Sequence, residues 1–356
     1  MTGVRDAFER NLIDGEVGAC FCATVDGEAI VDLYGGYADA ARTRPWERDT
    51  IVNVYSTTKT MAALTALLVA DRGELDFGAP VARYWPEFAA GGKGEVTVAQ
   101  VMGHSAGLSG WRASLHPEDL YDWEKVTALL AVQEPFWKPG TASGYHVVTQ
   151  GFLIGEIIRR ITGRSLGTVF HEEIATPLGA DFHIGLPESE EPRVAELIPY
   201  SQEPFSDNLT ALQDNAAHNP RLDTTVANSR AWRAAEIPAG GGTGNARSVA
   251  RIHTILANGG LGLLSETTCR LAAQVQIEGT DLILGTPVRF GLGFAVGGPF
   301  MPSDNTLYWG GAGGSFAVID MDAHATYAYA MNTMATDPML AFGPITAAWQ
   351  AVSQTR

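Results

Sequence analysis

The sequence has 356 residues, of which 46% are hydrophobic and 18% are charged, and its formal net charge is −16. This composition supports a sizeable core and excludes a disordered protein, while the length indicates about two domains or one domain with an insertion. So acidic a surface repels phosphate backbones, which argues against a nucleic-acid partner. The charged N-terminus is unlike a signal peptide, and the longest aliphatic stretch, residues 61–70, is too short to cross a bilayer. We expect a cytoplasmic protein with no membrane partner and leave its oligomeric state open.

The N-terminal part begins with the pattern of a short amphipathic helix over residues 2–12. Two apolar runs follow, at 18–25 and 28–36, and the Asp-Gly dipeptide between them is typical of a β-hairpin. Cys20 and Cys22 lie two apart in the first run, so they would face the same side of a strand. The chain has three cysteines and hence no disulfide framework. We expect these two thiols to be buried in the core and not to bind a metal.

Helical patterns dominate the middle of the chain. Apolar residues at helical spacing predict a helix over 57–72, ended by Gly73, and another over 152–162, ended by Gly163. The stretch 188–228 is polar and weakly periodic. It predicts a long loop that either covers a site or is only a surface excursion.

The C-terminal part returns to strand patterns. Residues 315–321 and 324–332 alternate like paired strands, and an apolar helix around 345–352 closes the chain. Strands at both ends with helices between them predict an α+β fold. In this fold one antiparallel sheet is built from both termini and flanked by helices, and a largely helical domain is inserted into it.

The predicted division gives a discontinuous sheet domain over residues 1–80 and 241–356 and a mostly helical domain over 81–240. A cleft between two such parts is the natural place for a ligand. We therefore expect the active site in that cleft.

The sharpest chemical signal is Ser56-Thr57-Thr58-Lys59, which opens the helix predicted over 57–72. A serine hydroxyl needs a neighbouring base, and residues three apart share a helix face, so Lys59 would lie one turn from Ser56. A desolvated lysine has a lowered pKa and can act as that base. The helix N-terminus adds free N–H groups near developing negative charge. The same four residues also fit a capping serine followed by a solvated lysine, because S-x-x-K is common by chance.

The surrounding sequence resembles the serine β-lactamase and penicillin-binding-protein superfamily. The strings over residues 50–88 and 96–111 place the S-x-x-K helix, an R-G-x-L-D turn and an H-S-x-G-L segment in that family's order and at its spacing. The chain looks most like the class C β-lactamase-like branch, which includes the family VIII carboxylesterases. The resemblance runs from about Val17 to Met334. It implies the β-lactamase-like fold and acylation of Ser56.

The family's second motif is a tyrosine followed two residues later by an asparagine. The matching tyrosine is Tyr145, and the resemblance implies that it relays the proton of the serine. Val147 stands where β-lactamases carry the asparagine, which removes an amide that would bind an acylamino group of the substrate. Apart from the resemblance, Tyr145 would pass for an ordinary half-buried aromatic residue.

The family's third motif, Lys-Thr-Gly, matches Trp309-Gly310-Gly311, and family VIII esterases resemble this chain in having Trp-Gly-Gly there. Glycines let an edge strand approach a ligand closely. By this correspondence the backbone N–H groups of Ala312 and Ser56 form the oxyanion hole, and residues 309–311 contact the substrate. The alternative interpretation is a glycine-rich turn between strands.

Three further patterns resemble known motifs but carry less weight. Residues 163–167 match G-x-S-x-G, but a nucleophile elbow follows a strand, whereas here a helix precedes Ser165, which suits an N-cap. Residues 240–244 resemble a phosphate loop without its lysine, and His171 begins a zinc-like motif that lacks a second histidine. We expect no metal and no cofactor.

Together these residues predict a serine carboxylesterase that cleaves a small-molecule ester through an acyl-enzyme. Lys59 and Tyr145 would handle the protons, and the sequence leaves open which of them is the base. The alternatives are an amidase, peptidase or β-lactamase that cleaves C–N bonds, an acyltransferase, and a non-catalytic ligand-binding protein. Trp309 replaces the cation of the β-lactamase motif, and either Arg289 or Arg247 would have to supply another.

Overall fold

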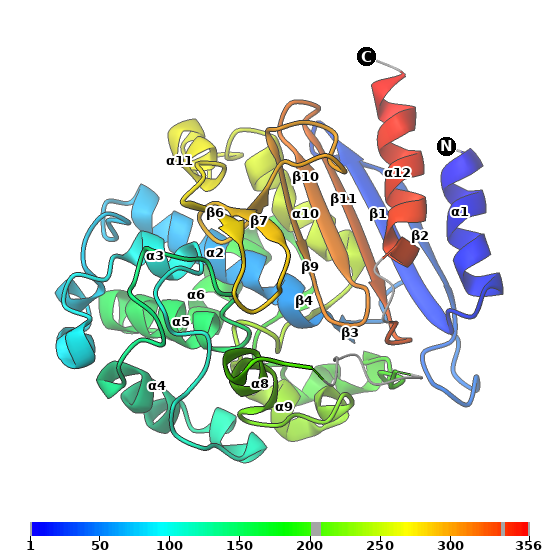
Figure 1. The fold of residues 1–356 in the computed structure, drawn as a ribbon. Coiled ribbons are helices and arrows are strands. Elements are labelled where there is room, and N and C mark those ends of the chain that lie inside the picture. Colours follow the sequence, from blue (N-terminus) through cyan, green and yellow to red (C-terminus); the bar gives the residue numbers. More distant parts are fainter. Residues whose placement is uncertain (1, 201–207, 336–338, 355–356) are drawn as a thin grey trace.

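The computed structural model describes residues 2–200, 208–335 and 339–354. Its largest element is an eight-stranded sheet in the order β2-β1-β11-β10-β9-β8-β7-β6, and every neighbouring pair is antiparallel (Figure 1). These strands all come from the two ends of the chain, as predicted. They are β1 (Gly18–Val25), β2 (Glu28–Gly36), β6 (Ile277–Thr280), β7 (Pro287–Phe290), β8 (Ala295–Val296), β9 (Thr306–Gly310), β10 (Phe316–Asp320) and β11 (Ala325–Met331).

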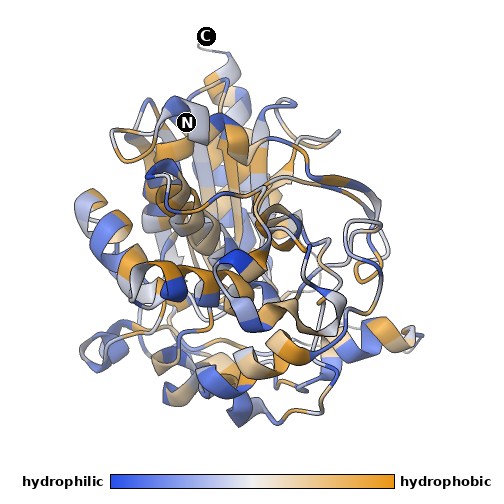
Figure 2. Ribbon diagram, turned by 90° about the vertical axis from the view of Figure 1, so that its left-hand side faces the viewer, coloured by the Kyte–Doolittle hydropathy of each residue, from blue (hydrophilic) through white to orange (hydrophobic). Residues whose placement is uncertain are grey.

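Helices cover both faces of this sheet. The N-terminal α1 (Thr2–Ile13) and the C-terminal α12 (Met339–Ser353) lie side by side on one face, and α10 (Ala246–Ala257) packs on the other (Figure 1). A hydrophobic core lies on each face of the sheet, and alternate residues of β1 pack into the two cores. Cys20 and Cys22 pack on the α10 side, and Phe21 packs on the side of the terminal helices. The strands are accordingly rich in apolar residues (Figure 2). The predicted burial of both thiols is confirmed.

The other helices cluster beside one end of the sheet (Figure 1). The helices predicted over 57–72 and 152–162 are confirmed as α2 and α5, and Gly163 ends α5 in the left-handed conformation. Within the described residues, no helix combines the length and the apolar character needed to cross a membrane. The helices of this part are α2 (Thr58–Asp71), α3 (Val98–Met102), α4 (Trp123–Val132), α5 (Thr149–Thr162), α6 (Leu166–Phe170), α7 (Thr176–Leu178), α8 (Ala211–His218), α9 (Arg230–Ala234) and α11 (Glu266–Ala272).

Short elements complete the fold. A second sheet joins three two-residue strands in the order β3-β5-β4 and lies at the start of α2. The strands are β3 (Val52–Asn53), β4 (Phe182–His183) and β5 (Thr243–Gly244), and the short helical turns are η1 (Tyr55–Thr57), η2 (Val81–Arg83), η3 (Pro86–Gly92), η4 (Pro117–Tyr121), η5 (His171–Ala175), η6 (Glu188–Arg193) and η7 (Val226–Asn228). The strands of the large sheet fall within the residues assigned to the sheet domain, and the division of the chain into two domains stays a prediction.

The stretch 188–228 is not simply a long loop, because it contains α8. The signal for this helix was present in the sequence, since Thr210 and Gln213 form a capping box at its start. The helix is short and its apolar residues have little periodicity, which is why the pattern did not reveal it. Residues 201–207 of this stretch lie outside the described part of the chain.

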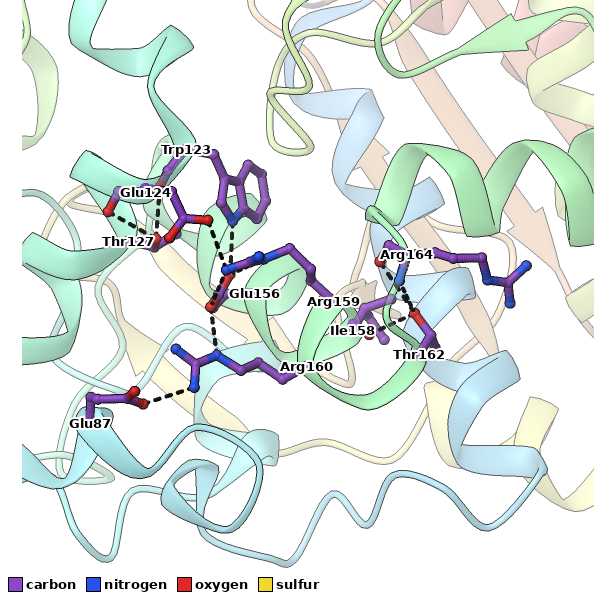
Figure 3. Close-up of polar contacts among 10 residues, drawn as sticks. All are labelled: Glu87, Trp123, Glu124, Thr127, Glu156, Ile158, Arg159, Arg160, Thr162 and Arg164. Atoms are coloured by element: carbon purple, nitrogen blue, oxygen red, sulfur yellow. Dashed lines mark hydrogen bonds and ion pairs between the residues drawn. The ribbon is translucent and has the colours of Figure 1, made fainter.

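A buried carboxylate ties three helical segments together, as shown in Figure 3. Glu156 on α5 has a side chain that is 1% exposed, and it accepts hydrogen bonds from Trp123 Nε1 at 2.8 Å and from the guanidinium groups of Arg159 and Arg160. Arg160 also donates to Glu87 in η3. Glu156 therefore fixes α4 and η3 against the helix that follows the predicted tyrosine motif.

We expect Glu156→Ala to lower the free energy of unfolding by about 3 kcal/mol at pH 7, because it leaves a buried indole N–H without its acceptor and removes the buried carboxylate that two guanidinium groups share. Burial raises the pKa of Glu156, but the hydrogen bonds from Arg159, Trp123 and Arg160 outweigh this and hold it below its usual value. The ionised carboxylate therefore stabilises the fold above its unfolded-state pKa, roughly 4.3. This contribution is lost as the pH falls through the folded-state pKa.

Urea denaturation of both proteins between pH 7 and pH 3.5 measures this difference. The gap in the free energy of unfolding between wild type and variant should begin to narrow within this range, as the pH falls below roughly 4.3. Glu124→Ala is the matched control, because Glu124 is 75% exposed and pairs with the same Arg159; its loss should cost less than about 1 kcal/mol. An equal effect of the two substitutions would contradict the assignment of Glu156 as the central group.

Candidate active site

A cavity of about 590 Å³ opens beside the start of α2. Its wall is mostly apolar, and within the described residues Asp223 and Arg289 are the charged side chains that line it. Lys59 and Gly311 do not line the cavity but contact residues that do. The predicted site residues that line it are Ser56, Tyr145, Val147, Trp309, Gly310 and Ala312.

The turn before Ser56 is held in an unusual backbone conformation. Tyr55 has φ +43°, in the left-handed region that residues with a side chain rarely adopt. Its N–H donates to Asn53 Oδ1 at 3.1 Å and its hydroxyl donates to the Thr224 carbonyl at 2.8 Å, so both ends of the residue are fixed. Strained residues of this kind persist where the surroundings determine them, and they cluster at functional sites. The turn directs the chain into η1 and places Ser56 at the cavity.

The glycine run 240–244, which resembles a phosphate loop, packs against this turn. The Gly242 N–H donates to Thr58 Oγ1 at 2.9 Å, and the Gly242 carbonyl accepts from the Val54 N–H at 2.9 Å. A Cβ at Gly242 would lie 2.5 Å from Thr58 Oγ1. The glycine at 242 is therefore explained by this close approach to the start of α2.

Lys59 lies one turn from Ser56, as the spacing predicted. Its side chain is 1% exposed, and Nζ lies 3.2 Å from Ser56 Oγ, 2.6 Å from the Val147 carbonyl and 3.0 Å from the Ala239 carbonyl. Burial holds the pKa of the Lys59 amine well below its usual value. The alternative of a solvated lysine is therefore wrong for this chain.

Tyr145 lies against both Lys59 and the Trp309 strand. Its ring centroid is 4.8 Å from Lys59 Nζ and 5.9 Å from the Trp309 ring. Burial raises the pKa of the Tyr145 phenol, while hydrogen bonds with the side chains of Ser56 and Trp309 act in the opposite direction. The structure thus brings Ser56, Lys59 and Tyr145 together, although Tyr145 lies far from the other two in sequence.

The Trp309-Gly310-Gly311 segment lies at the end of β9, and the prediction that this is an edge strand is wrong. β9 is not an edge strand, because it lies between β8 and β10. However, β8 pairs only with Leu307 and Tyr308, so Trp309 and Gly310 extend beyond it toward the cavity. The strand pattern alone did not reveal β8, which is only two residues long.

Gly311 is the point at which this strand meets the turn before α2. A Cβ there would lie 2.1 Å from the Val54 carbonyl oxygen and 3.2 Å from Ser56 N. Only glycine permits this approach, which brings the neighbouring Ala312 next to Ser56. Within the described residues, neither the Ser56 N–H nor the Ala312 N–H donates a hydrogen bond to another protein group. Both donors are therefore available to a ligand oxygen.

Ser315 and His104 support the arrangement of Ser56, Tyr145 and Trp309, although no sequence pattern predicted a function for either residue. The Ser315 hydroxyl donates to the Val54 carbonyl at 2.7 Å and lies 2.9 Å from Thr57 Oγ1, which holds the turn between β9 and β10 against η1. The His104 ring stacks on Trp309 at 5.5 Å and meets Tyr145 edge-on at 4.9 Å. Both belong to segments that the resemblance drew attention to, but only the fold shows what they contact.

The other candidate motifs have structural explanations. Ser165 caps α6 by accepting the Thr168 N–H, and its hydroxyl donates to Glu236. The expected N-cap is confirmed. In the zinc-like segment, Glu172 and Glu173 form ion pairs with Arg164.

The two arginines named as possible replacements for the missing cation differ in position. Arg289 lines the cavity, with Nε 3.7 Å from Glu278 and a terminal nitrogen 3.8 Å from Asp304. Arg247 does not line it and pairs with Asp32 at 3.1 Å. Of the two, only Arg289 can meet a bound ligand, and its contacts with the exposed carboxylates of Glu278 and Asp304 are longer than hydrogen bonds.

Comparison with known proteins agrees with this geometry. The family model for Beta-lactamase matches residues 5–348. Esterase/beta-lactamase LipL of Mycobacterium tuberculosis is 35% identical over 336 residues, which cover 89% of this chain and 77% of LipL. The crystal structure of a family VIII carboxylesterase is 44% identical, with a TM-score of 0.93, over 98% of this chain and 96% of that one. A penicillin-binding protein homologue from Caulobacter crescentus is 38% identical, also with a TM-score of 0.93, over 98% and 97% of the two chains. The chain therefore belongs to the β-lactamase family.

Proposed function

We propose that the protein is a serine carboxylesterase that cleaves small carboxylic esters through an acyl-enzyme on Ser56. One observation carries the proposal: a fully buried lysine amine lies 3.2 Å from the hydroxyl of a serine that lines an apolar cavity. The relatives named as esterases and the carboxylesterase structure support an ester hydrolase on this fold. The intact group of Ser56, Lys59 and Tyr145 argues against a non-catalytic binding protein.

We propose that Lys59 is the base and that it acts in its neutral form. A neutral amine has two N–H donors and one lone pair. The Val147 and Ala239 carbonyls accept two donors, which leaves the lone pair directed toward the Ser56 hydroxyl. Burial favours the neutral forms of both the lysine and the Tyr145 phenol. A neutral phenol donates and accepts at one oxygen, so Tyr145 can pass the proton onward.

In the proposed reaction, Ser56 Oγ attacks the ester carbonyl as its proton moves to Lys59. The negative charge on the carbonyl oxygen is stabilised by the free N–H groups of Ser56 and Ala312. Tyr145 then gives its proton to the departing alkoxide and takes up the proton held by Lys59, which restores both neutral groups, and the alcohol leaves an acyl group on Ser56. Water attacks the acyl-enzyme in the same way and releases the acid.

The apolar wall bears on the choice of substrate. Trp309 is 5% exposed and packs against Phe290 at 5.4 Å, and Val147 presents an aliphatic side chain to the cavity. A carboxylate that enters such a site loses hydration without a full replacement, whereas a short neutral acyl group does not. Because the relative LipL is named both esterase and β-lactamase, β-lactam cleavage is the second candidate function.

We expect a short neutral ester such as p-nitrophenyl butyrate to exceed a penicillin or a cephalosporin in kcat/KM by at least ~10²-fold, as the desolvation cost of the carboxylate implies. Steady-state kinetics with both substrates on one preparation measure the ratio. Arg289→Ala is the control for the cation at the cavity wall: a fall in β-lactam cleavage with ester cleavage retained would assign Arg289 the role of the missing lysine. If the β-lactam equals or exceeds the ester, the enzyme is a β-lactamase and the proposal of a carboxylesterase is wrong.

The state of the cysteines and the size of the cavity bear on the cellular location and on the substrate. All three cysteines are free and buried, which suits a reducing compartment, so we propose a cytoplasmic protein. A cavity of about 590 Å³ has the size of a small-molecule site, so we propose a small-molecule ester as the substrate that it binds.

A further inference from the structure

Asp281 is a buried carboxylate beside the catalytic group that the proposed reaction does not use. It is 0% exposed, and its oxygens accept four hydrogen bonds. The donors are Ser143 Oγ at 2.6 Å, the Tyr145 N–H at 3.0 Å, and the N–H groups of Ile283 and Leu284 at 2.9 Å each. Within the described residues, no lysine, arginine or histidine forms an ion pair with it. A buried carboxylate satisfied only by uncharged donors holds those donors in a fixed arrangement.

These donors come from two segments that are far apart in the sequence. Ser143 and Tyr145 precede α5, whereas the other two donors lie with Asp281 itself on the connection between β6 and β7. The Leu282 N–H also donates to the Ser143 carbonyl at 2.8 Å, so backbone contacts reinforce the junction. Ile283 on the same connection lines the cavity. One carboxylate therefore fixes both the predicted proton-relay tyrosine and a wall of the cavity.

The backbone and the ring of Tyr145 are supported separately. Asp281 holds the backbone N–H, while the ring packs against His104 and Trp309. His104 in turn accepts the His146 N–H at 3.0 Å. If the hydrogen bond from the Tyr145 N–H to Asp281 is lost, the ring contacts remain but the backbone of Tyr145 is no longer held in place.

We propose that Asp281 is a positioning residue that sets the place of Tyr145 relative to Ser56 and at the same time holds the cavity wall at Ile283 and Leu284. This inference rests on the proposed role of Tyr145 in proton transfer. The physical reason lies in the charge and acceptor capacity of the carboxylate. One oxygen accepts three backbone N–H groups, whereas an asparagine offers them a neutral oxygen with two lone pairs and turns its NH2 group toward the Ser143 hydroxyl. A displacement of the order of 1 Å is enough to lower a rate by about 10²-fold.

The test is a double-mutant cycle with p-nitrophenyl butyrate. We expect Asp281→Asn to lower kcat by ~10- to 100-fold and to raise KM, because the relay and the wall are both displaced. Added to Tyr145→Phe, the same substitution should lower kcat by less than about 3-fold while still raising KM, because its effect on the chemistry runs through the missing hydroxyl. A full multiplicative loss in the double variant, or an unchanged kcat in Asp281→Asn, would overturn the inference.

Asp71→Asn is the matched control, since Asp71 also accepts a backbone N–H and hydroxyl groups, but at the start of α11. It should leave kcat and KM within about 2-fold of wild type. If Asp281→Asn does not fold, Ser143→Ala removes a single donor and should give a smaller fall in kcat that again disappears beside Tyr145→Phe. Should Ser143→Ala leave kcat at the wild-type value, the inference fails on that result alone.

Failure of the proposed function has a different signature. If Tyr145→Phe alone retains wild-type kcat, the proposed role of Tyr145 is wrong, whatever Asp281→Asn does. If Tyr145→Phe loses activity and Asp281→Asn does not, only the inference about Asp281 is wrong.

Discussion

Ser56→Ala is expected to remove covalent labelling by an organophosphonate and to lower ester turnover by at least ~10³-fold, because the substitution deletes the atom that forms the acyl-enzyme. The structure gives the reason for choosing this serine among those of the chain. Its hydroxyl lies 3.2 Å from a buried amine, at the cavity wall and next to the free N–H of Ala312. Mass spectrometry of the labelled protein, with peptide mapping, measures the first effect, and steady-state kinetics measure the second.

Ser165→Ala is the matched control, because Ser165 stands in a G-x-S-x-G sequence that resembles a nucleophile elbow. Its hydroxyl caps α6 and donates to Glu236, so its loss should lower the free energy of unfolding by about 2 kcal/mol. Turnover by the folded protein should stay near the wild-type value. Label on Ser165, or loss of turnover in this variant alone, would refute the assignment of Ser56.

Lys59→Met and Tyr145→Phe should each lower kcat by at least ~10²-fold, within the range of general acid–base catalysis. The double variant should lose much less than the product of the two, because groups that act as a unit are not additive. The structure supports a shared function, since Lys59 Nζ lies 3.2 Å from Ser56 Oγ and 4.8 Å from the centroid of the Tyr145 ring. Rates measured for the four proteins of the cycle test this, and independent losses would assign the two groups separate tasks.

The pH profile adds a second readout for Lys59. A neutral base is lost on protonation, so kcat/KM should fall as the pH is lowered through the pKa of the amine. Because burial lowers this pKa well below its usual value, the activity should persist to a more acidic pH than an ordinary lysine would allow. Lys59→Met should remove this limb of the profile. A profile with the same limb in the variant would mean that another group titrates there.

Local patterns were enough to predict the first half of the site. Ser56 and Lys59 are three apart on one helix, so their contact follows from helix geometry alone. The terminal hairpins and the paired cysteines of β1 were likewise predictable, because strand alternation is local. Tyr145 and Trp309 were identified only through the resemblance to a known family, since no periodicity brings them to Ser56.

The supporting contacts could not be predicted, because they join segments that are distant in sequence. Asp281 and Tyr145 are 136 residues apart, and Ser315 and Val54 are 261 apart. No short sequence pattern indicates either contact, because each forms only when the order of the strands in the large sheet brings the two segments together. The same cause explains the incorrect description of β9 as an edge strand, because its neighbour β8 is too short to recognise.

The order of the large sheet also determines when this enzyme becomes active during its synthesis. β1 pairs with β11 over seven residues, so β1 has to wait for a strand that is synthesised much later. Contacts of such high sequence separation form slowly and leave an apolar strand unpaired in the meantime. The end of β9, which presents Ala312 to Ser56, is also made late. A nascent chain that already carries Ser56 and Lys59 therefore lacks a finished oxyanion site until the segment that contains Ala312 has been made and has paired.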